Sequence, residues 1–206
     1  MSLTMLHRRA VLAAALALPM LGASRALGAA ASAAEQFVAQ NIQRGLNILN
    51  DTSLGNDQRR ARFAEFLLGL TDIRRVALFL LGQYATGASA SQVDAFVDAF
   101  RDYSLAVYQS YFAQYAGQTL RVTGSRQRAP GDDIVSTTLT GPGSDPVEVD
   151  FRVRSDGGKP VLVDIAVAGL WLALAQRAEF SAVLSRNHGD ISALIGHLHN
   201  TAAQYR

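Results

Sequence analysis

The side chains best suited to metal or acid–base chemistry in this sequence include three histidines, His188, His197 and His199. His197 and His199 are two residues apart in a segment with helical spacing, so their side chains point to different sides of that helix. A structural zinc site needs clustered nitrogen and sulfur ligands, and the sequence contains no cysteine. We therefore expect no metal site, no disulfide and no thiol chemistry.

Three aspartates, Asp72, Asp150 and Asp164, are the candidates for a general base. Cone-shaped α+β folds can hold isomerases or hydratases that use one such carboxylate. Asp72 is placed as a helix cap, and Asp150 on the solvated face of a strand. Asp164 lies between apolar neighbours, and its simplest role is to pair with an arginine such as Arg152, because buried charges are normally paired. A small cavity enzyme with Asp164 as its base stays open as an alternative.

The sequence contains none of the motifs that build the common catalytic sites. It has no Gly-x-Ser-x-Gly elbow, no phosphate-binding loop and no dinucleotide-binding glycine pattern. Gly157 and Gly158 belong to a predicted hairpin turn and not to a strand-to-helix junction. We expect no catalytic residue and no cofactor, which favours a binding protein or, as a further alternative, a non-catalytic interaction module of the cell envelope.

The N-terminal residues predict an export signal. Arg8 and Arg9 form a basic start, an apolar run follows over residues 10–18, and a stretch of small residues comes next. The apolar run is too short for a transmembrane helix, which needs ~20 residues. We expect residues 1–28 to be removed, with cleavage between 28 and 34, and the protein to be periplasmic. The paired arginines fit a twin-arginine-like signal, and a general secretory signal fits as well.

The charge of the mature chain argues against nucleic-acid binding. The full sequence has 19 basic and 17 acidic residues, but three of the arginines lie within the first 28 residues. The mature chain is therefore close to neutral, whereas a nucleic-acid-binding protein presents a basic stripe or face. We interpret Arg121, Arg126 and Arg128, with Arg152 and Arg154 nearby, as a solvated strand face.

Apolar periodicity predicts helices on both sides of a strand region. The predicted helices span residues 34–51, 56–70, 71–84, 91–115, 169–186 and 189–204. The long helix starts at Ser91 as N-cap, and Asp190 caps the last one. The long helix also carries a broad aromatic stripe, which we expect to pack against a sheet.

Four strands are predicted between these helices, over residues 118–128, 132–141, 146–155 and 159–169. Their short connections demand antiparallel pairing. The turn at residues 156–158 can pair Val153 with Val161, and the alternation then places both apolar rows on one face. These rows are Val147, Val149, Phe151 and Val153 in the third strand, and Val161, Val163, Ile165 and Val167 in the fourth.

Together the elements predict an α+β fold in which helices wrap around one face of a twisted four-stranded antiparallel sheet. Residues 35–204 are long enough for a single domain with a sizeable core. Trp171, the only tryptophan, lies where the last strand meets the next helix. The apolar surface fits either a plain core or a core that encloses an apolar cavity for a ligand.

Two blocks of residues resemble the MlaC family, also called the toluene-tolerance auxiliary family. The first block consists of Asp72, Leu81-Gly82-Gln83-Tyr84, Phe96, Phe100, Tyr108 and Tyr115. The second block consists of Asp164, Val167, Gly169, Arg177 and Phe180. The resemblance rests on the order and spacing of these blocks, and it covers roughly residues 35–200.

The chain departs from the usual pattern of that family at three places. Ala85 stands where tryptophan is common, Leu170 and Trp171 follow Gly169 where Val-Ser is common, and Gln176 stands where tyrosine is common. These departures resemble the branch that is linked to hopanoid biosynthesis, HpnM.

The resemblance implies a periplasmic carrier that binds phospholipid, or a hopanoid-type lipid, in an apolar pocket. Its implied partners are an inner-membrane ABC transporter with an MCE-domain protein and an outer-membrane lipoprotein complex. The predicted lipid-binding residues are Leu78, Leu81, Phe96, Phe100, Tyr103, Val107, Tyr111, Val149, Phe151, Val153, Val163, Ile165, Val167, Leu170 and Trp171.

Overall fold

The computed structural model describes residues 32–112 and 115–205, without the side chains of Tyr111, Phe112 and Asp156. The chain divides into two units, residues 1–30 and 31–206, and the description below concerns the second. The predicted export signal, residues 1–28, lies outside the described residues. Within the described ranges, no helix is long and apolar enough to cross a membrane.

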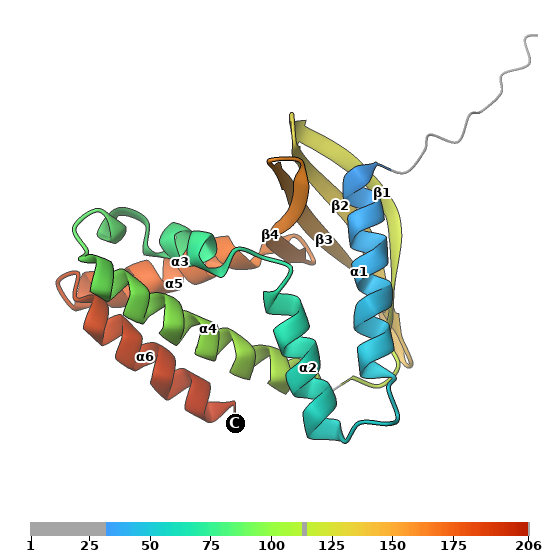
Figure 1. The fold of residues 1–206 in the computed structure, drawn as a ribbon, viewed down its shortest axis with the longest axis horizontal. Coiled ribbons are helices and arrows are strands. Elements are labelled where there is room, and N and C mark those ends of the chain that lie inside the picture. The colour runs from blue at the N-terminus through green and yellow to red at the C-terminus, as the bar shows by residue number, and fades with distance from the viewer. Residues whose placement is uncertain (1–31, 113–114, 206) are drawn as a thin grey trace, which may run out of the picture. The chain divides into compact units, whose positions relative to one another are not determined.

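Helices come before and after a continuous strand region, as the periodicity of the sequence predicts (Figure 1). The elements are α1 (Ala33–Leu49), α2 (Asn56–Leu68), α3 (Ile73–Leu81), the 3-10 helix η1 (Gly82–Ala85), α4 (Ala90–Phe112), β1 (Thr119–Ala129), β2 (Asp132–Gly141), β3 (Ser144–Asp156), β4 (Lys159–Val167), β5 (Leu170–Trp171), α5 (Leu172–Arg186) and α6 (Ile191–Gln204).

Short polar side chains cap the starts of several helices. The Asp72 carboxylate accepts from the backbone N–H of Arg75 at 3.0 Å and begins α3, and Asp190 begins α6 in the same way. Both predicted caps are confirmed. The predicted cap at Ser91 is wrong, because the hydroxyl of Ser89 accepts from the backbone N–H of Gln92 and α4 already includes Ser91.

The sheet is an antiparallel meander in which neighbours in sequence are neighbours in space, in the order β1-β2-β3-β4-β5. It has five strands where the sequence predicted four. The additional strand, β5, pairs Leu170 with Val167 and Trp171 with Ala166. Ala168 and Gly169, which both have positive φ, reverse the chain tightly enough to allow this pairing.

The register between β3 and β4 differs from the prediction in two ways. At the turn Asp156 pairs with Lys159, so Val153 pairs with Leu162 and not with Val161. Beyond that pair β4 carries an extra residue, because the next residue of β3, Arg152, pairs with Asp164. Such a bulge leaves one residue without a partner and reverses the alternation of the strand beyond it. The three valines and one isoleucine of the predicted row therefore do not share a face. Val161 and Val163 lie on the face opposite to that of Ile165 and Val167.

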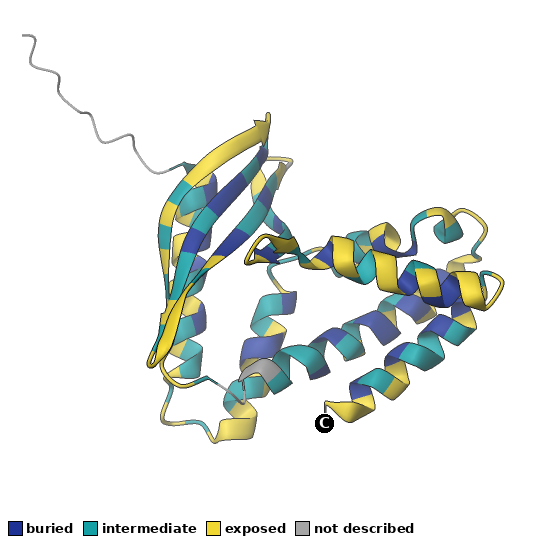
Figure 2. Cartoon of the chain, turned by 180° about the vertical axis from the view of Figure 1, so that it is seen from behind, coloured by how far each residue is buried: buried dark blue, intermediate teal, exposed yellow. Residues whose placement is uncertain are grey.

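One face of the sheet is apolar and packs against α1. Ala34 and Val38 of α1 form a buried cluster with Val135 of β2 and Val153 of β3. Figure 2 shows that buried residues alternate with less buried ones along these strands, as expected for a sheet with two different faces. The opposite face carries Arg152 and its charged neighbours.

The helices α3 to α6 form a second core of their own. Phe96 and Phe100 of α4 meet the ring of Phe180 in α5 edge-on, at centroid distances of 6.2 and 6.3 Å. Leu194 and Leu198 of α6 complete this cluster and are fully buried. The prediction that the aromatic stripe of the long helix packs against the sheet is therefore wrong, because its aromatic residues fill the space between helices instead.

Candidate functional site

An apolar pocket of about 370 Å³ lies between α1, α2 and the apolar face of the sheet. Its walls are almost wholly hydrocarbon, because each element turns its apolar stripe or row toward it. The apolar lining residues are Phe37, Val38, Ile42, Leu46, Leu49, Phe63, Phe66, Leu67, Leu70, Leu120, Leu139, Val149, Phe151, Leu162, Ile165 and Val167. We call this space the apolar pocket.

Gly45 sets how closely the two helices of the apolar pocket approach each other. It is buried on α1 and lines the pocket, and the ring of Phe63 from α2 lies directly over it. A Cβ at this position would stand 2.9 Å from Cε2 of Phe63. A residue larger than glycine here therefore forces α2 or its phenylalanine away from α1.

One end of the apolar pocket becomes polar. Asn41 donates from Nδ2 to the carbonyl of Phe37 at 2.8 Å, and its Oδ1 is buried without a donor. Asn41 also lines an outer pocket of about 390 Å³, to which Gln40 and Arg44 contribute. No ion-pair partner of Arg44 occurs among the residues that the structure describes. The apolar pocket thus adjoins a polar pocket, and such an arrangement suits the binding of an amphiphile.

A model of the MlaC protein family matches residues 39–200 of this sequence, which is most of the chain and includes all but two of the residues that line the apolar pocket. The chain belongs to the MlaC family. It is also similar to the solved structure of a phospholipid-binding protein from Ralstonia solanacearum in complex with a phospholipid. The two are 25% identical, with a TM-score of 0.74 over 84% of this chain and 99% of the other.

Four of the predicted lipid-binding residues line the apolar pocket of this MlaC family member. They are Val149 and Phe151 on β3 and Ile165 and Val167 on β4. Val153 lies on the same face but is fully covered by α1. The alternation of β3 was thus sufficient to find its pocket-facing side chains.

The other predicted lipid-binding residues lie elsewhere in the described part of the chain. Leu81, Phe96, Phe100 and Tyr103 belong to the core of α3 to α6 or pack against it. Phe100 and Val163 line a narrow space of about 80 Å³ between α4 and β4. Trp171 and Val163 line a pocket on the charged face of the sheet. Leu78 and Leu170 are 38% and 60% exposed, Val107 is half-buried, and the side chain of Tyr111 lies outside the described residues.

Most of the pocket-lining residues that sequence reasoning missed come from α1 and α2, and others include Leu120 of β1, Leu139 of β2 and Leu162 of β4. The helical spacing of α1 and α2 was visible in Ile42, Leu46, Phe63 and Phe66, but the pattern does not reveal which helix covers the sheet. A usable signal was Gly45, because a glycine inside a strongly periodic helix often marks a close approach by another element.

The carboxylate of Asp164 holds the start of α5. It accepts from the backbone N–H groups of Ile165 at 2.8 Å and of Ala173 at 3.0 Å. Burial raises the pKa of Asp164 above its ordinary value, and these two hydrogen bonds and the charge of Arg152 oppose that rise. Asp164 faces Arg152 across the ladder, but the predicted ion pair between them does not form.

Arg152 pairs with Asp132 of β2 instead. Its Nε and one terminal nitrogen donate to the two carboxylate oxygens of Asp132 at 2.9 and 2.6 Å. This bidentate bond lowers the pKa of Asp132 and raises that of Arg152. Asp150 lies on the same face but is buried with one oxygen unpartnered, so its predicted solvation is wrong.

Among residues 32–112 and 115–205, no cluster of histidine, aspartate and glutamate has the arrangement of a metal site. His197 lies 3.4 Å from the carboxylate of Glu179 between α6 and α5, on the surface. The described part of the chain thus presents apolar surface, and not a set of catalytic groups, as its main candidate for function.

Proposed function

We propose that this protein is a carrier that holds the hydrocarbon of a phospholipid in the apolar pocket and moves it through the periplasm. The observation that carries the proposal is the pocket itself, an apolar space between α1, α2 and the sheet that adjoins a polar outer pocket. The phospholipid bound to the similar protein from Ralstonia solanacearum supports the choice of ligand. MlaC is a periplasmic family, and the predicted export signal, twin-arginine-like or general secretory, agrees with that location.

The energetics explain why such a carrier is needed. Each methylene group that leaves a membrane for water costs about 0.8 kcal/mol, so a lipid with two acyl chains loses on the order of 20 kcal/mol. Spontaneous transfer through an aqueous compartment is then negligible. A pocket that offers comparable burial makes the exchange between membrane and protein nearly isoenergetic, and a partner can set the direction.

The size of the apolar pocket limits what it holds. If a methylene group needs about as much room as a water molecule, roughly 30 Å³, the volume of about 370 Å³ accommodates on the order of a dozen methylene groups. That is most of one acyl chain. A second chain therefore requires α1 or α2 to move away from the sheet, or it must lie along the exposed rim of the pocket.

The polar end of the pocket suits a head group. Oδ1 of Asn41 offers a buried acceptor to a hydroxyl or ammonium group, and Arg44 stands in the outer pocket, where a phosphate can reach it. Weak polar recognition of this kind lets the protein release its ligand. The departures at Ala85 and Trp171 favour a hopanoid-type lipid as the second candidate ligand.

The partners proposed for this carrier are an inner-membrane ABC transporter with an MCE-domain protein on one side and an outer-membrane lipoprotein complex on the other. Both follow from the family resemblance. The alternatives of an Asp164-dependent enzyme and of an interaction module without a ligand differ from the carrier in one measurable property, because only the carrier retains lipid through purification.

The decisive experiment is native mass spectrometry of the mature protein purified from its periplasm, followed by organic extraction and identification of the lipid. We expect one phospholipid per chain. A hopanoid in its place would assign the second candidate ligand. Protein that is free of lipid and takes up none from phospholipid vesicles would refute the carrier.

A further inference from the structure

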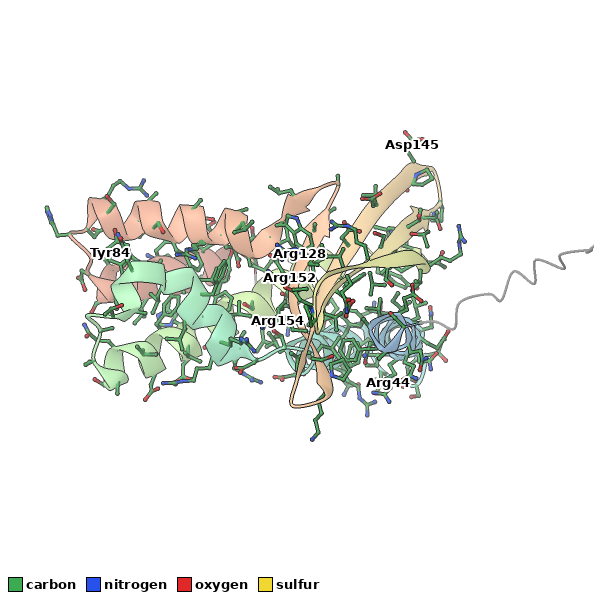
Figure 3. All side chains as sticks on the ribbon, turned by 90° about the horizontal axis from the view of Figure 1, so that it is seen from above. Arg44, Tyr84, Arg128, Asp145, Arg152 and Arg154 are labelled. Atoms are coloured by element: carbon green, nitrogen blue, oxygen red, sulfur yellow. The ribbon has the colours of Figure 1, made fainter. Side chains whose placement is uncertain are left out.

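A second pocket, of about 420 Å³, lies on the charged face of the sheet, away from α1. Five arginines line it: Arg75 of α3, Arg126 and Arg128 of β1, and Arg152 and Arg154 of β3. Figure 3 labels three of them, Arg128, Arg152 and Arg154, which lie near one another where the sheet faces the helices. We call this space the arginine pocket.

The arginines of this pocket are not all neutralised by carboxylates. Asp132 forms ion pairs with two of them, since it binds Arg152 bidentately and its carboxylate lies 3.6 Å from Arg128. Arg126 makes no ion pair with a described residue, and Nε of Arg154 is buried without an acceptor. A buried donor without an acceptor in a native site calls for an explanation, such as a bound water or ion.

The carboxylates that also line the arginine pocket are engaged with the backbone. Asp72 accepts from the start of α3, and Asp164 accepts from Ile165 and Ala173. Asp164 also acts on the charge of Arg152, but neither carboxylate forms an ion pair with Arg126 or Arg154. Positive charge on Arg126 and Arg154 is therefore left to face the pocket.

The wall that α3, β5 and α5 form is largely apolar, although Arg75 belongs to it. It includes Val76 and Phe79 of α3, Trp171 of β5 and Leu174 of α5. Phe79 and Leu174 are 39% and 55% exposed, so apolar surface continues to the rim. A site for a free inorganic anion gains nothing from such a wall, whereas a site for an anion attached to hydrocarbon does.

We propose that the arginine pocket is a second binding site, distinct from the apolar pocket, for a phosphate group carried by an amphiphile such as an anionic lipid. Guanidinium groups bind phosphate oxygens through two parallel hydrogen bonds, which point charges cannot reproduce. Arg126 and Arg154 supply the open donors, and Phe79 and Leu174 cover the first carbons of the attached chain. Along β3 the sheet separates the two pockets, because neighbouring residues such as Phe151 and Arg152 point into different ones, and Leu162 of β4 lines both.

The test compares two probes on the mature protein by isothermal titration calorimetry: inorganic phosphate, and dihexanoyl phosphatidylglycerol below its micellar concentration. The double variant Arg126→Gln/Arg154→Gln should weaken both at least about tenfold, because it removes charge-assisted hydrogen bonds. Leu174→Gln should weaken only the lipid. Arg62→Gln, which removes one positive charge from an exposed position on α2 outside the pocket, is the control and should leave both unchanged.

Each outcome decides a part of the proposal. Lipid binding that the double variant leaves intact, or no binding of either probe, overturns the arginine pocket as a phosphate site. Equal affinity for both probes, with no effect of Leu174→Gln, assigns the site to free phosphate and overturns the amphiphile. The lipid that is retained through purification serves as a separate readout of the apolar pocket, and the double variant should keep it.

Discussion

Gly45 of α1 and Phe63 of α2 are in direct contact, and a Cβ on the glycine would stand 2.9 Å from the edge of the phenylalanine ring. This contact closes one side of the apolar pocket. It also holds together the two helices that cover the pocket, so a side chain at Gly45 would affect both the stability of the fold and the room available for lipid.

A pair of glycine-to-alanine variants tests that contact. Gly196 of α6 has open space where a Cβ would stand, so Gly196→Ala should stabilise the protein by about 0.5–1 kcal/mol through helix propensity alone. Gly45→Ala receives the same gain but must displace Phe63, at a cost of about 1–3 kcal/mol. The free energy of unfolding, from urea titration, should therefore rise for Gly196→Ala and fall for Gly45→Ala. Equal stabilisation of both variants would show that α2 and Phe63 move away from α1 without a measurable cost.

Leu46 provides a test of the apolar pocket that does not depend on the identity of the lipid. It lines the pocket from α1 and is only half-buried, so Leu46→Gln keeps a good helix former and should cost little stability. A polar amide in the wall opposes bound hydrocarbon, and we expect at least about a tenfold loss of retained lipid, in line with burying an unpaired polar group. The ratio of lipid to protein after extraction measures it.

The control for Leu46→Gln is Leu170→Gln. Leu170 was predicted to bind lipid but is 60% exposed and lines none of the pockets described here. The Leu170→Gln variant should therefore retain as much lipid as the wild type. A loss of lipid in Leu170→Gln with none in Leu46→Gln would place the ligand outside the apolar pocket, near the turn between β4 and β5.

The amino-acid sequence carries the local signals of this fold more clearly than its tertiary contacts. Val149 and Phe151 were found because alternation is a property of the strand itself. The bulge that separates Val163 from Ile165 leaves no mark in the composition, because valine and isoleucine fit either face equally well. The packing of Phe96 against Phe180 depends on which helices meet, and an amphipathic stripe shows only that it will be covered.

Asp164 is expected to stabilise the fold and not to act in catalysis. Asp164→Ala leaves the backbone N–H groups of Ile165 and Ala173 without their acceptor, which should cost about 1–3 kcal/mol. Asp164→Asn keeps an acceptor oxygen and should cost less. Hydrogen exchange at Ala173 should accelerate in the alanine variant, whereas retained lipid should not change. A loss of lipid in the asparagine variant at unchanged stability would give this side chain a direct role in binding.

The ion pair between Asp132 and Arg152 should make the stability of the fold depend on pH in the acidic range. The pKa of Asp132 is lowered below its ordinary value of 3.8, chiefly by the hydrogen bond from Arg152. A carboxylate with a lowered pKa in the folded state contributes stability above its unfolded pKa and loses that contribution as the pH falls through the folded value. At neutral pH the free energy of unfolding of the wild type should therefore exceed that of Asp132→Asn by about 1–2 kcal/mol, which is the difference between charged and neutral hydrogen bonds.

That difference should shrink as the pH falls below 3.8, because protonation then removes the same charge from the wild type. Urea titrations between pH 7 and pH 2 measure it, with Asp133→Asn, the neighbouring residue on β2, as the control. A constant difference across this range would mean that the asparagine disturbs packing and that the charge of Asp132 is not what stabilises the fold.

If the charge is responsible, Asp132→Asn also frees Arg128 and Arg152 from their carboxylate partner. Inorganic phosphate should then bind the arginine pocket more tightly in this variant than in the wild type.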